Sequence, residues 1–103
     1  MSHFSLEREG VKVKVILGTD LTVSCVPELR ELLCAIRDDG VQDLTLDFSK
    51  TTFLDTAGLS LLLAARNGFS QEGRTMRLIS VRSSVFAVLE TLRLDQRLNA
   101  ERG

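Results

Sequence analysis

Residues 44–63 constrain the fold more than any other part of the chain, because they join a strand pattern directly to a helix pattern. Residues 44–48 alternate between apolar and polar types and are rich in residues that favour strands. Leucines then recur at helical spacing from Leu59 onward, after only a short polar stretch. The pattern therefore predicts a strand, a turn and a helix in direct succession.

The turn at residues 55–58 is the first candidate for a functional site. Asp55 and Thr56 are residue types that cap a first helical turn. A helix N-terminus carries unpaired backbone N–H groups and the positive end of the helix dipole. The small residues Ala57 and Gly58 predict a bare turn whose backbone another molecule could approach closely. Such a turn is either a plain helix cap or a recognition point.

Composition and charge exclude several classes of function. The chain has 103 residues, of which 44% are hydrophobic and 26% charged, as expected of one globular domain covering residues 1–103. The formal net charge of −1 argues against an electrostatic surface for nucleic acid or membrane. Only 5% of the residues are aromatic, with neither Trp nor Tyr, so no stacking platform for bases or sugars is expected.

The N-terminus and the cysteines indicate a cytoplasmic protein. Residues 1–7 show no signal-peptide pattern, and no apolar run approaches the roughly 20 residues that span a bilayer. Cys25 and Cys34, on one helix, would lie about 13–14 Å apart along its axis and on opposite faces, so no disulfide is expected. With His3 as the only histidine and no C-x-x-C pair, we expect neither a metal site nor a cofactor.

Apolar spacing also predicts the remaining elements. We expect a short strand at 4–6, a turn at Glu9-Gly10, a strand at 11–17, a helix from near Ser24 to Gly40, a strand at 76–81, a helix at 85–92 capped by Ser83-Ser84, one more turn or a short strand at 94–98, and a frayed tail at 99–103. A hairpin followed by strand–helix–strand steps predicts an α/β fold with a mixed sheet. Lys12 and Lys14 alternate with valines and are expected on a solvated sheet face.

Catalytic and nucleotide-binding motifs are missing from the sequence. There is no P-loop and no G-x-G-x-x-G fingerprint, and the single histidine lies in the N-terminal arm, away from any nucleophile. Asp38-Asp39 is expected to be a solvated corner, and Glu90 and Arg93 an exposed pair on the last helix. A phospho-acceptor role for Asp55, as in receiver domains, would need a late lysine, and no lysine follows residue 50. The sequence therefore predicts a binding protein rather than an enzyme.

Two segments, Asp47-Phe48-Ser49 and Leu54-Asp55-Thr56-Ala57-Gly58-Leu59, resemble the signature of STAS domains, which anti-sigma factor antagonists and sulphate transporter tails share. The signature is roughly D-[LF]-S, a few residues, and then [FV]-[ILM]-D-[ST]-[SAG]-G-L. The likeness extends over nearly the whole chain, including the loop at 17–21, the strand at 76–81 and the ending at 92–95. It implies a STAS-like mixed sheet of four to five strands, with three to four helices packed mainly on one face.

The resemblance also implies a function in partner switching. Anti-sigma factor antagonists bind an anti-sigma factor that is a serine kinase of the histidine-kinase-like ATPase type, so ATP would belong to that partner. Asp20 is either a partner contact or a loop residue that bonds its own backbone. Thr22 stands where the family often has an aspartate. The implied binding face consists of Asp20, Thr22, Ser24, Asp55, Thr56, Ala57 and Gly58.

Ala57 is the main departure from the antagonist pattern. The matching residue in the best-known antagonists is a serine that the kinase phosphorylates, whereas alanine has no hydroxyl. The alanine is either natural or an engineered block of phosphorylation. Thr56 then supplies the available hydroxyl, as the helix N-cap or as a partner contact or phospho-acceptor. An alternative partner is an ABC transporter ATPase, because the small STAS subunit of a phospholipid-transport complex resembles this chain in having Asp-Thr before a small residue and Gly-Leu.

Overall fold

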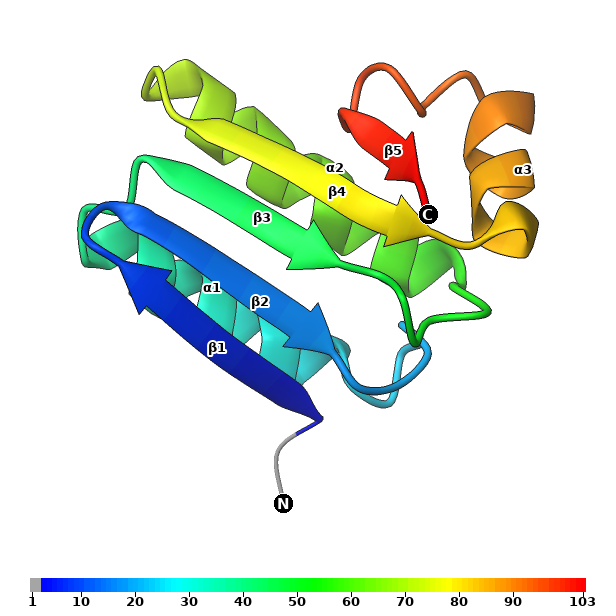
Figure 1. Cartoon of the computed structure of the whole chain (residues 1–103), viewed down its shortest axis with the longest axis horizontal. Coiled ribbons are helices and arrows are strands. Elements are labelled where there is room, and N and C mark those ends of the chain that lie inside the picture. Colours follow the sequence, from blue (N-terminus) through cyan, green and yellow to red (C-terminus); the bar gives the residue numbers. More distant parts are fainter. Residues whose placement is uncertain (1–2) are drawn as a thin grey trace.

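A computed structural model describes residues 3–103 and shows a five-stranded sheet in the order β1-β2-β3-β4-β5 (Figure 1). The β1–β2 pair is antiparallel and the other pairs are parallel, which confirms the mixed α/β sheet. Figure 1 shows α1 and α2 behind the sheet and α3 beside its β4–β5 end. The elements are β1 (Phe4–Glu9), β2 (Lys12–Leu17), α1 (Val26–Asp38), β3 (Asp43–Asp47), α2 (Thr56–Gln71), β4 (Thr75–Val81), α3 (Ser83–Thr91) and β5 (Ala100–Arg102).

The core lies between the sheet and the two covering helices. On β2, Val13, Val15 and Leu17 are buried, and the alternate residues face the other way, as the period of two predicts. Leu29 on α1 and Leu62 on α2 are completely buried against this face. Because the helical leucines recur every three or four residues, each helix turns one apolar stripe toward the strands.

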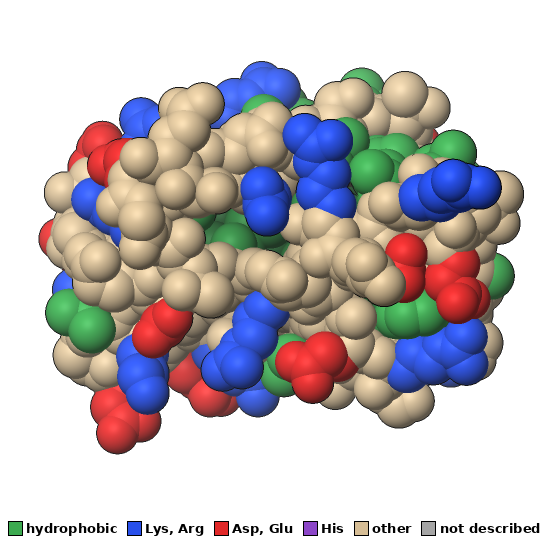
Figure 2. Space-filling view, turned by 90° about the horizontal axis from the view of Figure 1, so that it is seen from above, with side chains coloured by type: hydrophobic (Ala, Val, Ile, Leu, Met, Phe, Trp, Pro, Cys, Tyr) green, Lys and Arg blue, Asp and Glu red, His purple; other side chains and the backbone are tan. Residues whose placement is uncertain are grey.

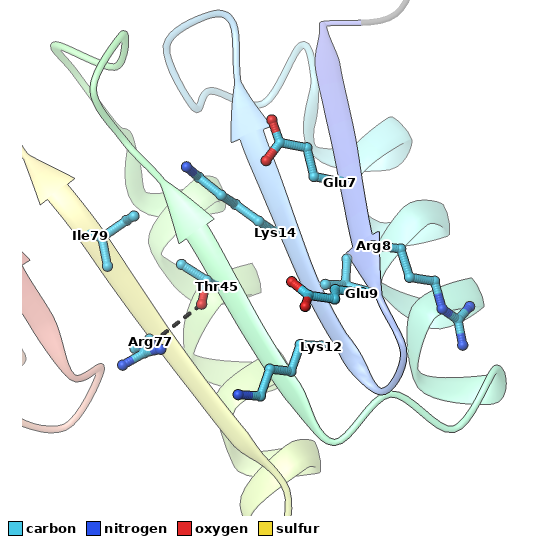
Figure 3. A pocket seen from close by; sticks show the side chains of 9 residues that line it. Glu7, Arg8, Glu9, Lys12, Lys14, Thr45, Arg77 and Ile79 are labelled. Atoms are coloured by element: carbon cyan, nitrogen blue, oxygen red, sulfur yellow. Dashed lines mark hydrogen bonds between the residues drawn. The ribbon is translucent and has the colours of Figure 1, made fainter.

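The opposite face of the sheet is open and carries charges of both signs (Figure 3). Its shallow hollow has a volume of about 540 Å³. Lys14 Nζ lies 3.6 Å from Asp47 Oδ2, and Arg77 Nε donates to Thr45 Oγ1 at 3.3 Å. Lys12 is exposed on the same face, so the prediction of a solvated face for the two lysines is confirmed.

Two predicted helix starts need correction. The first helix begins at Val26, with Cys25 as its N-cap, slightly later than the expected start near Ser24. The last helix begins at Ser83, but its N-cap is Arg82, and the predicted Ser83-Ser84 cap is wrong. Ser84 Oγ instead donates to the carbonyl of Thr52 at 3.0 Å, because this helix start packs against the loop that follows β3.

The C-terminal tail is ordered, so the predicted fraying at 99–103 is wrong. Residues 95–99 form turns, and Ala100–Arg102 then pairs with β4. The completely buried side chain of Leu98 anchors this segment, and Asn99 Nδ2 donates to the Met76 carbonyl at 3.0 Å. Arg102 takes Glu90 as its ion-pair partner at 3.0 Å, in place of the predicted Glu90–Arg93 pair.

The cysteines stay unpaired, as predicted. Cys25 is buried and Cys34 is exposed, and both are free thiols. Within residues 3–103, no group of three or more His, Cys, Asp or Glu side chains could hold a metal ion. None of the helices described is long and apolar enough to cross a membrane.

Candidate docking site at the start of α2

Two loops meet at the end of the sheet where β2 and β3 terminate (Figure 1). The β2–α1 loop comprises residues 18–25 and the β3–α2 loop residues 48–55. Leu21 and Leu54 form an isolated parallel bridge between them. The Leu21 amide donates to the Phe53 carbonyl at 3.1 Å, and the Leu21 carbonyl accepts from the Asp55 amide at 3.1 Å. The predicted binding residues of the two loops are thereby brought together.

Asp55 holds both the helix and the neighbouring loop. Its Oδ1 accepts from the Gly58 amide at 2.8 Å and its Oδ2 from the Val23 amide at 2.8 Å. The bond from Gly58, followed by that from Val23, lowers the pKa of Asp55 below its usual value. Asp55 is therefore the N-cap of α2, and Thr56 is its first helical residue. The interpretation of Thr56 as the cap is wrong, because the carboxylate one residue earlier already bonds the first turn.

Asp20 makes the reciprocal connection from the β2–α1 loop. Its Oδ1 accepts from the Thr52 amide at 2.7 Å, the Thr52 hydroxyl at 3.0 Å and the Phe53 amide at 3.2 Å. The Thr52 amide contributes most to lowering the pKa of Asp20. Asp20 thus bonds the backbone of the other loop rather than its own. We call Asp20 and Asp55 the aspartate clasp, since each carboxylate reaches from one loop to the other.

Gly58 is buried against the β2–α1 loop. A Cβ placed there would lie 2.6 Å from the Leu21 carbonyl oxygen and 2.7 Å from Leu21 Cγ. The expected close approach of another molecule at Gly58 is therefore wrong, because Leu21 of the same chain occupies that space. The glycine is needed at this position for packing within the chain. In the sequence, a glycine that allows such packing looks the same as one that exposes the backbone to another molecule.

The remaining predicted site residues surround this buried contact. Ser24 and Thr56 are exposed, while Thr22 and Ala57 are half-buried, and Ala57 packs against the core. The Thr56 hydroxyl has no hydrogen-bond partner among the described residues. Its accessibility meets a necessary condition for the predicted contact role.

Two apolar side chains that the sequence analysis missed flank this turn. Val23 is 65% exposed and Phe53 is 57% exposed, although both sit in loops that are otherwise tied down. The Val23 amide bonds Asp55 and the Phe53 amide bonds Asp20, so both lie beside the clasp. We call Val23, Phe53 and Thr56 the docking surface. Exposed apolar groups beside polar ones are typical of protein-binding surfaces, and aromatic residues are often their anchors.

The molecular surface gives no sign of single-charge recognition on the face seen from above. Figure 2 shows acidic and basic side chains interspersed over that face, with hydrophobic groups between them. This agrees with the net charge of −1. That face therefore carries no extended patch of a single charge sign.

Comparison with known proteins identifies a matching domain family and several relatives of this chain. A family described as "Mlab, STAS domain" matches residues 4–100. An anti-sigma-B factor antagonist of Staphylococcus aureus is 26% identical over 90 residues, which cover 87% of this chain and 83% of that protein. The corresponding antagonist of Staphylococcus epidermidis is 23% identical over the same coverage of both chains.

Solved structures show the same fold. A crystal structure of a candidate anti-sigma factor antagonist from Thermotoga maritima has a TM-score of 0.90 at 17% identity, covering 97% of this chain and 86% of that one. An anti-sigma factor antagonist from Mycobacterium paratuberculosis has a TM-score of 0.83 at 20% identity, with coverage of 97% and 85%. A sulfate transporter family protein from Wolinella succinogenes has a TM-score of 0.78 at 13% identity, with coverage of 92% and 80%.

Proposed function

The chain belongs to the STAS domain family, as its motif predicts, and from this premise we propose that it is a non-enzymatic partner-switching regulator of the anti-sigma factor antagonist kind. Its partner is an anti-sigma factor with a histidine-kinase-like ATPase domain. The partner binds ATP, and this chain needs no cofactor. Such a partner places the interaction in the cytoplasm. The names of the curated relatives, which are anti-sigma-B factor antagonists, support this choice.

The observation that carries the proposal is an exposed docking surface on a rigid support. The aspartate clasp and the Leu21–Leu54 bridge fix the two loops, so Val23, Phe53 and Thr56 are held in place before any partner arrives. Binding then costs little additional ordering of the loops, and most of the contact energy remains available for affinity. An apolar pocket on the partner that accepts Phe53 would suit this arrangement.

Ala57 gives the proposed regulator a distinctive property. The antagonists that the motif resembles carry a phosphorylated serine at this position, and the methyl group here cannot accept a phosphate. Binding would therefore not be switched off at position 57. The neighbouring Thr56 hydroxyl is exposed, and a phosphate there would add about −1.5 to −2 charges at pH 7. Burying that charge unpaired under a partner would cost several kcal/mol.

The test is isothermal titration calorimetry, in which the host's anti-sigma factor ATPase is titrated with the wild-type chain and, separately, with Thr56→Glu to measure the two affinities. We expect Thr56→Glu to lower the affinity at least about 10-fold, corresponding to about 1.4 kcal/mol. Its fold should persist, because an acidic residue in the first turn of a helix is favourable. Ser70→Glu, at an exposed position near the other end of α2, is the matched control and should bind like the wild type. Unchanged affinity of Thr56→Glu would contradict the assignment of this surface.

The alternative partner, an ABC transporter ATPase, would use the same exposed Thr56 hydroxyl. Co-purification from the native host distinguishes the two. Recovery of a histidine-kinase-like ATPase that is released by Thr56→Glu supports the antagonist proposal. Recovery of an ABC ATPase that is likewise released by Thr56→Glu would contradict the antagonist proposal and support the transporter alternative.

A further inference from the structure

Within residues 3–103, β1 is an edge strand that pairs with a neighbour on one side only. It pairs with β2 over six consecutive residues without a bulge, and it contains no proline. An edge strand of this kind presents a row of outward amide and carbonyl groups that can pair with another chain. Natural proteins protect such edges with bulges, prolines or charged side chains, and of these β1 has only the charges at residues 7–9.

The ladder alternation indicates which backbone groups point outward. The Gly18 amide donates to the His3 carbonyl at 2.7 Å, directly before the register pair Phe4↔Leu17. Because hydrogen-bonded and non-bonded pairs alternate in an antiparallel ladder, Glu7 then bonds toward β2, whereas Leu6 directs its amide and carbonyl to the open edge.

An apolar groove lies under this edge. It has a volume of about 200 Å³ and runs between β1 and α1, where Leu6 faces Leu32 and Ile36. Leu6 is 45% exposed even though it stands opposite the completely buried Val15 in the ladder. The Leu6 side chain is therefore incompletely covered. A further strand beside β1 would cover it if that strand placed an apolar residue opposite Leu6.

We propose that β1 is a dimerisation edge, at which a second copy of this chain pairs antiparallel with β1 about a two-fold axis at Leu6. The two sheets become continuous, Leu6 of each copy stands opposite Leu6 of the other, and the two grooves close against each other. The docking surface lies outside this edge, so each dimer presents it twice.

The charges of β1 disfavour the registers centred on Glu7 and Arg8, and a centre at Leu6 rather than Ser5 brings the two partly exposed Leu6 side chains together. Pairing centred on Glu7 would put the two Glu7 carboxylates directly opposite each other, and pairing centred on Arg8 would do the same with two guanidinium groups. Pairing centred on Leu6 puts Glu7 opposite Ser5 and Arg8 opposite Phe4, with no like charges facing each other. Figure 3 shows Glu7 and Glu9 over the open sheet face and Arg8 pointing away from them, and Arg8 pairs with Asp39 on the helix side of the sheet.

Sedimentation equilibrium tests the dimer. Between about 10 μM and 1 mM, we expect the wild-type mass to rise from that of one chain toward that of two. Leu6→Lys should weaken the dimer at least about 10-fold, because two ammonium groups would meet at the axis. Leu92→Lys, at a side chain that is 50% exposed at the other end of the molecule, is the control and should dimerise normally. A wild-type chain that stays monomeric up to 1 mM, or equal loss in both variants, would overturn the proposal.

Disulfide trapping tests the register in a Cys34→Ala background, with Leu6→Cys or Glu7→Cys added. Oxidised glutathione is the oxidant: one introduced thiolate displaces a glutathione, and the thiolate of the second copy displaces the other, so that one disulfide and two glutathiones result. Directly paired residues have Cα atoms about 5.5 Å apart, within the range of a disulfide. We expect Leu6→Cys to cross-link and Glu7→Cys, whose Cα atoms would lie about 8 Å apart, to remain monomeric on denaturing gels. Preferential cross-linking of Glu7→Cys would reject the register centred on Leu6.

Discussion

Replacing Gly58 with alanine tests whether the two loops are packed as tightly as the structure shows. The added Cβ would lie 2.6 Å from the Leu21 carbonyl oxygen and 2.7 Å from Leu21 Cγ. That carbonyl accepts the Asp55 amide at 3.1 Å, so Leu21 cannot retreat without weakening the bridge between the loops. A change of side-chain rotamer alone cannot relieve the overlap, because one of the two overlapping Leu21 atoms belongs to the backbone.

Two opposing effects decide the magnitude. Forcing an extra methyl group into a packed interior costs typically about 1–3 kcal/mol. Alanine gains at most about 1 kcal/mol over glycine in a helix interior, and less in a first turn. We therefore expect Gly58→Ala to lower the free energy of unfolding by about 1–2 kcal/mol. For a domain of this size, each kcal/mol corresponds to a fall in Tm of about 4–8 °C.

Gly68→Ala is the matched control for this prediction. Gly68 lies in the same helix, and a Cβ there would have Arg37 Nη1 as its nearest neighbour at 3.8 Å, an ordinary contact. The same substitution should therefore raise the free energy of unfolding by up to about 1 kcal/mol. Urea unfolding at pH 7 measures both variants. Equal or greater stability of Gly58→Ala relative to the wild type would refute the packing argument.

The remaining predictions concern acid, a buried hydroxyl and the thiols. The clasp aspartates have lowered pKa values, so their stabilisation is present above the unfolded pKa of about 4 and is lost as the pH falls through the folded value. Asp20→Asn should therefore destabilise at pH 7, and urea titrations should show its deficit shrinking below pH 4. Thr51→Val should cost about 1 kcal/mol in thermal or urea unfolding, because the buried hydroxyl donates to a carbonyl of the β2–α1 loop at 2.9 Å. An aromatic disulfide reagent should modify Cys34 rapidly in the native state and Cys25 only on unfolding, and rapid reaction of both would contradict the burial of Cys25.

Local periodicity was sufficient to predict most of the fold. The alternating valines of β2 and the helical leucines of α2 each specify a buried face through neighbours in the sequence alone. Gly40 also follows a local rule, since it ends α1 with a φ of +78°, a conformation that favours glycine. The short strand β5 could not be predicted this way, because its order depends on the burial of Leu98 against distant elements.

The aspartate clasp lay beyond sequence analysis for a similar reason. Asp20 and Asp55 each looked like a residue that bonds its own local backbone, which is the commonest role of aspartate in a loop. Asp20 instead accepts from the Thr52 amide, 32 positions away, and Asp55 accepts from the Val23 amide, also 32 positions away, in addition to its local bond from Gly58. Only the parallel placement of β2 and β3, which brings their following loops together, creates these partners.

The two loops divide their apolar residues between support and recognition. Leu21 and Leu54 turn inward and form the bridge, whereas Val23 and Phe53, one or two positions away, turn outward. Apolar residues in a short loop have no period that separates the two roles, so sequence alone does not tell the four apart. The hydrogen bonds separate them, because the clasp fixes the Val23 and Phe53 amides and so holds their side chains facing solvent. A folded chain that keeps an aromatic ring exposed on a rigid loop forgoes its burial, and a partner that buries the ring recovers that stabilisation as affinity.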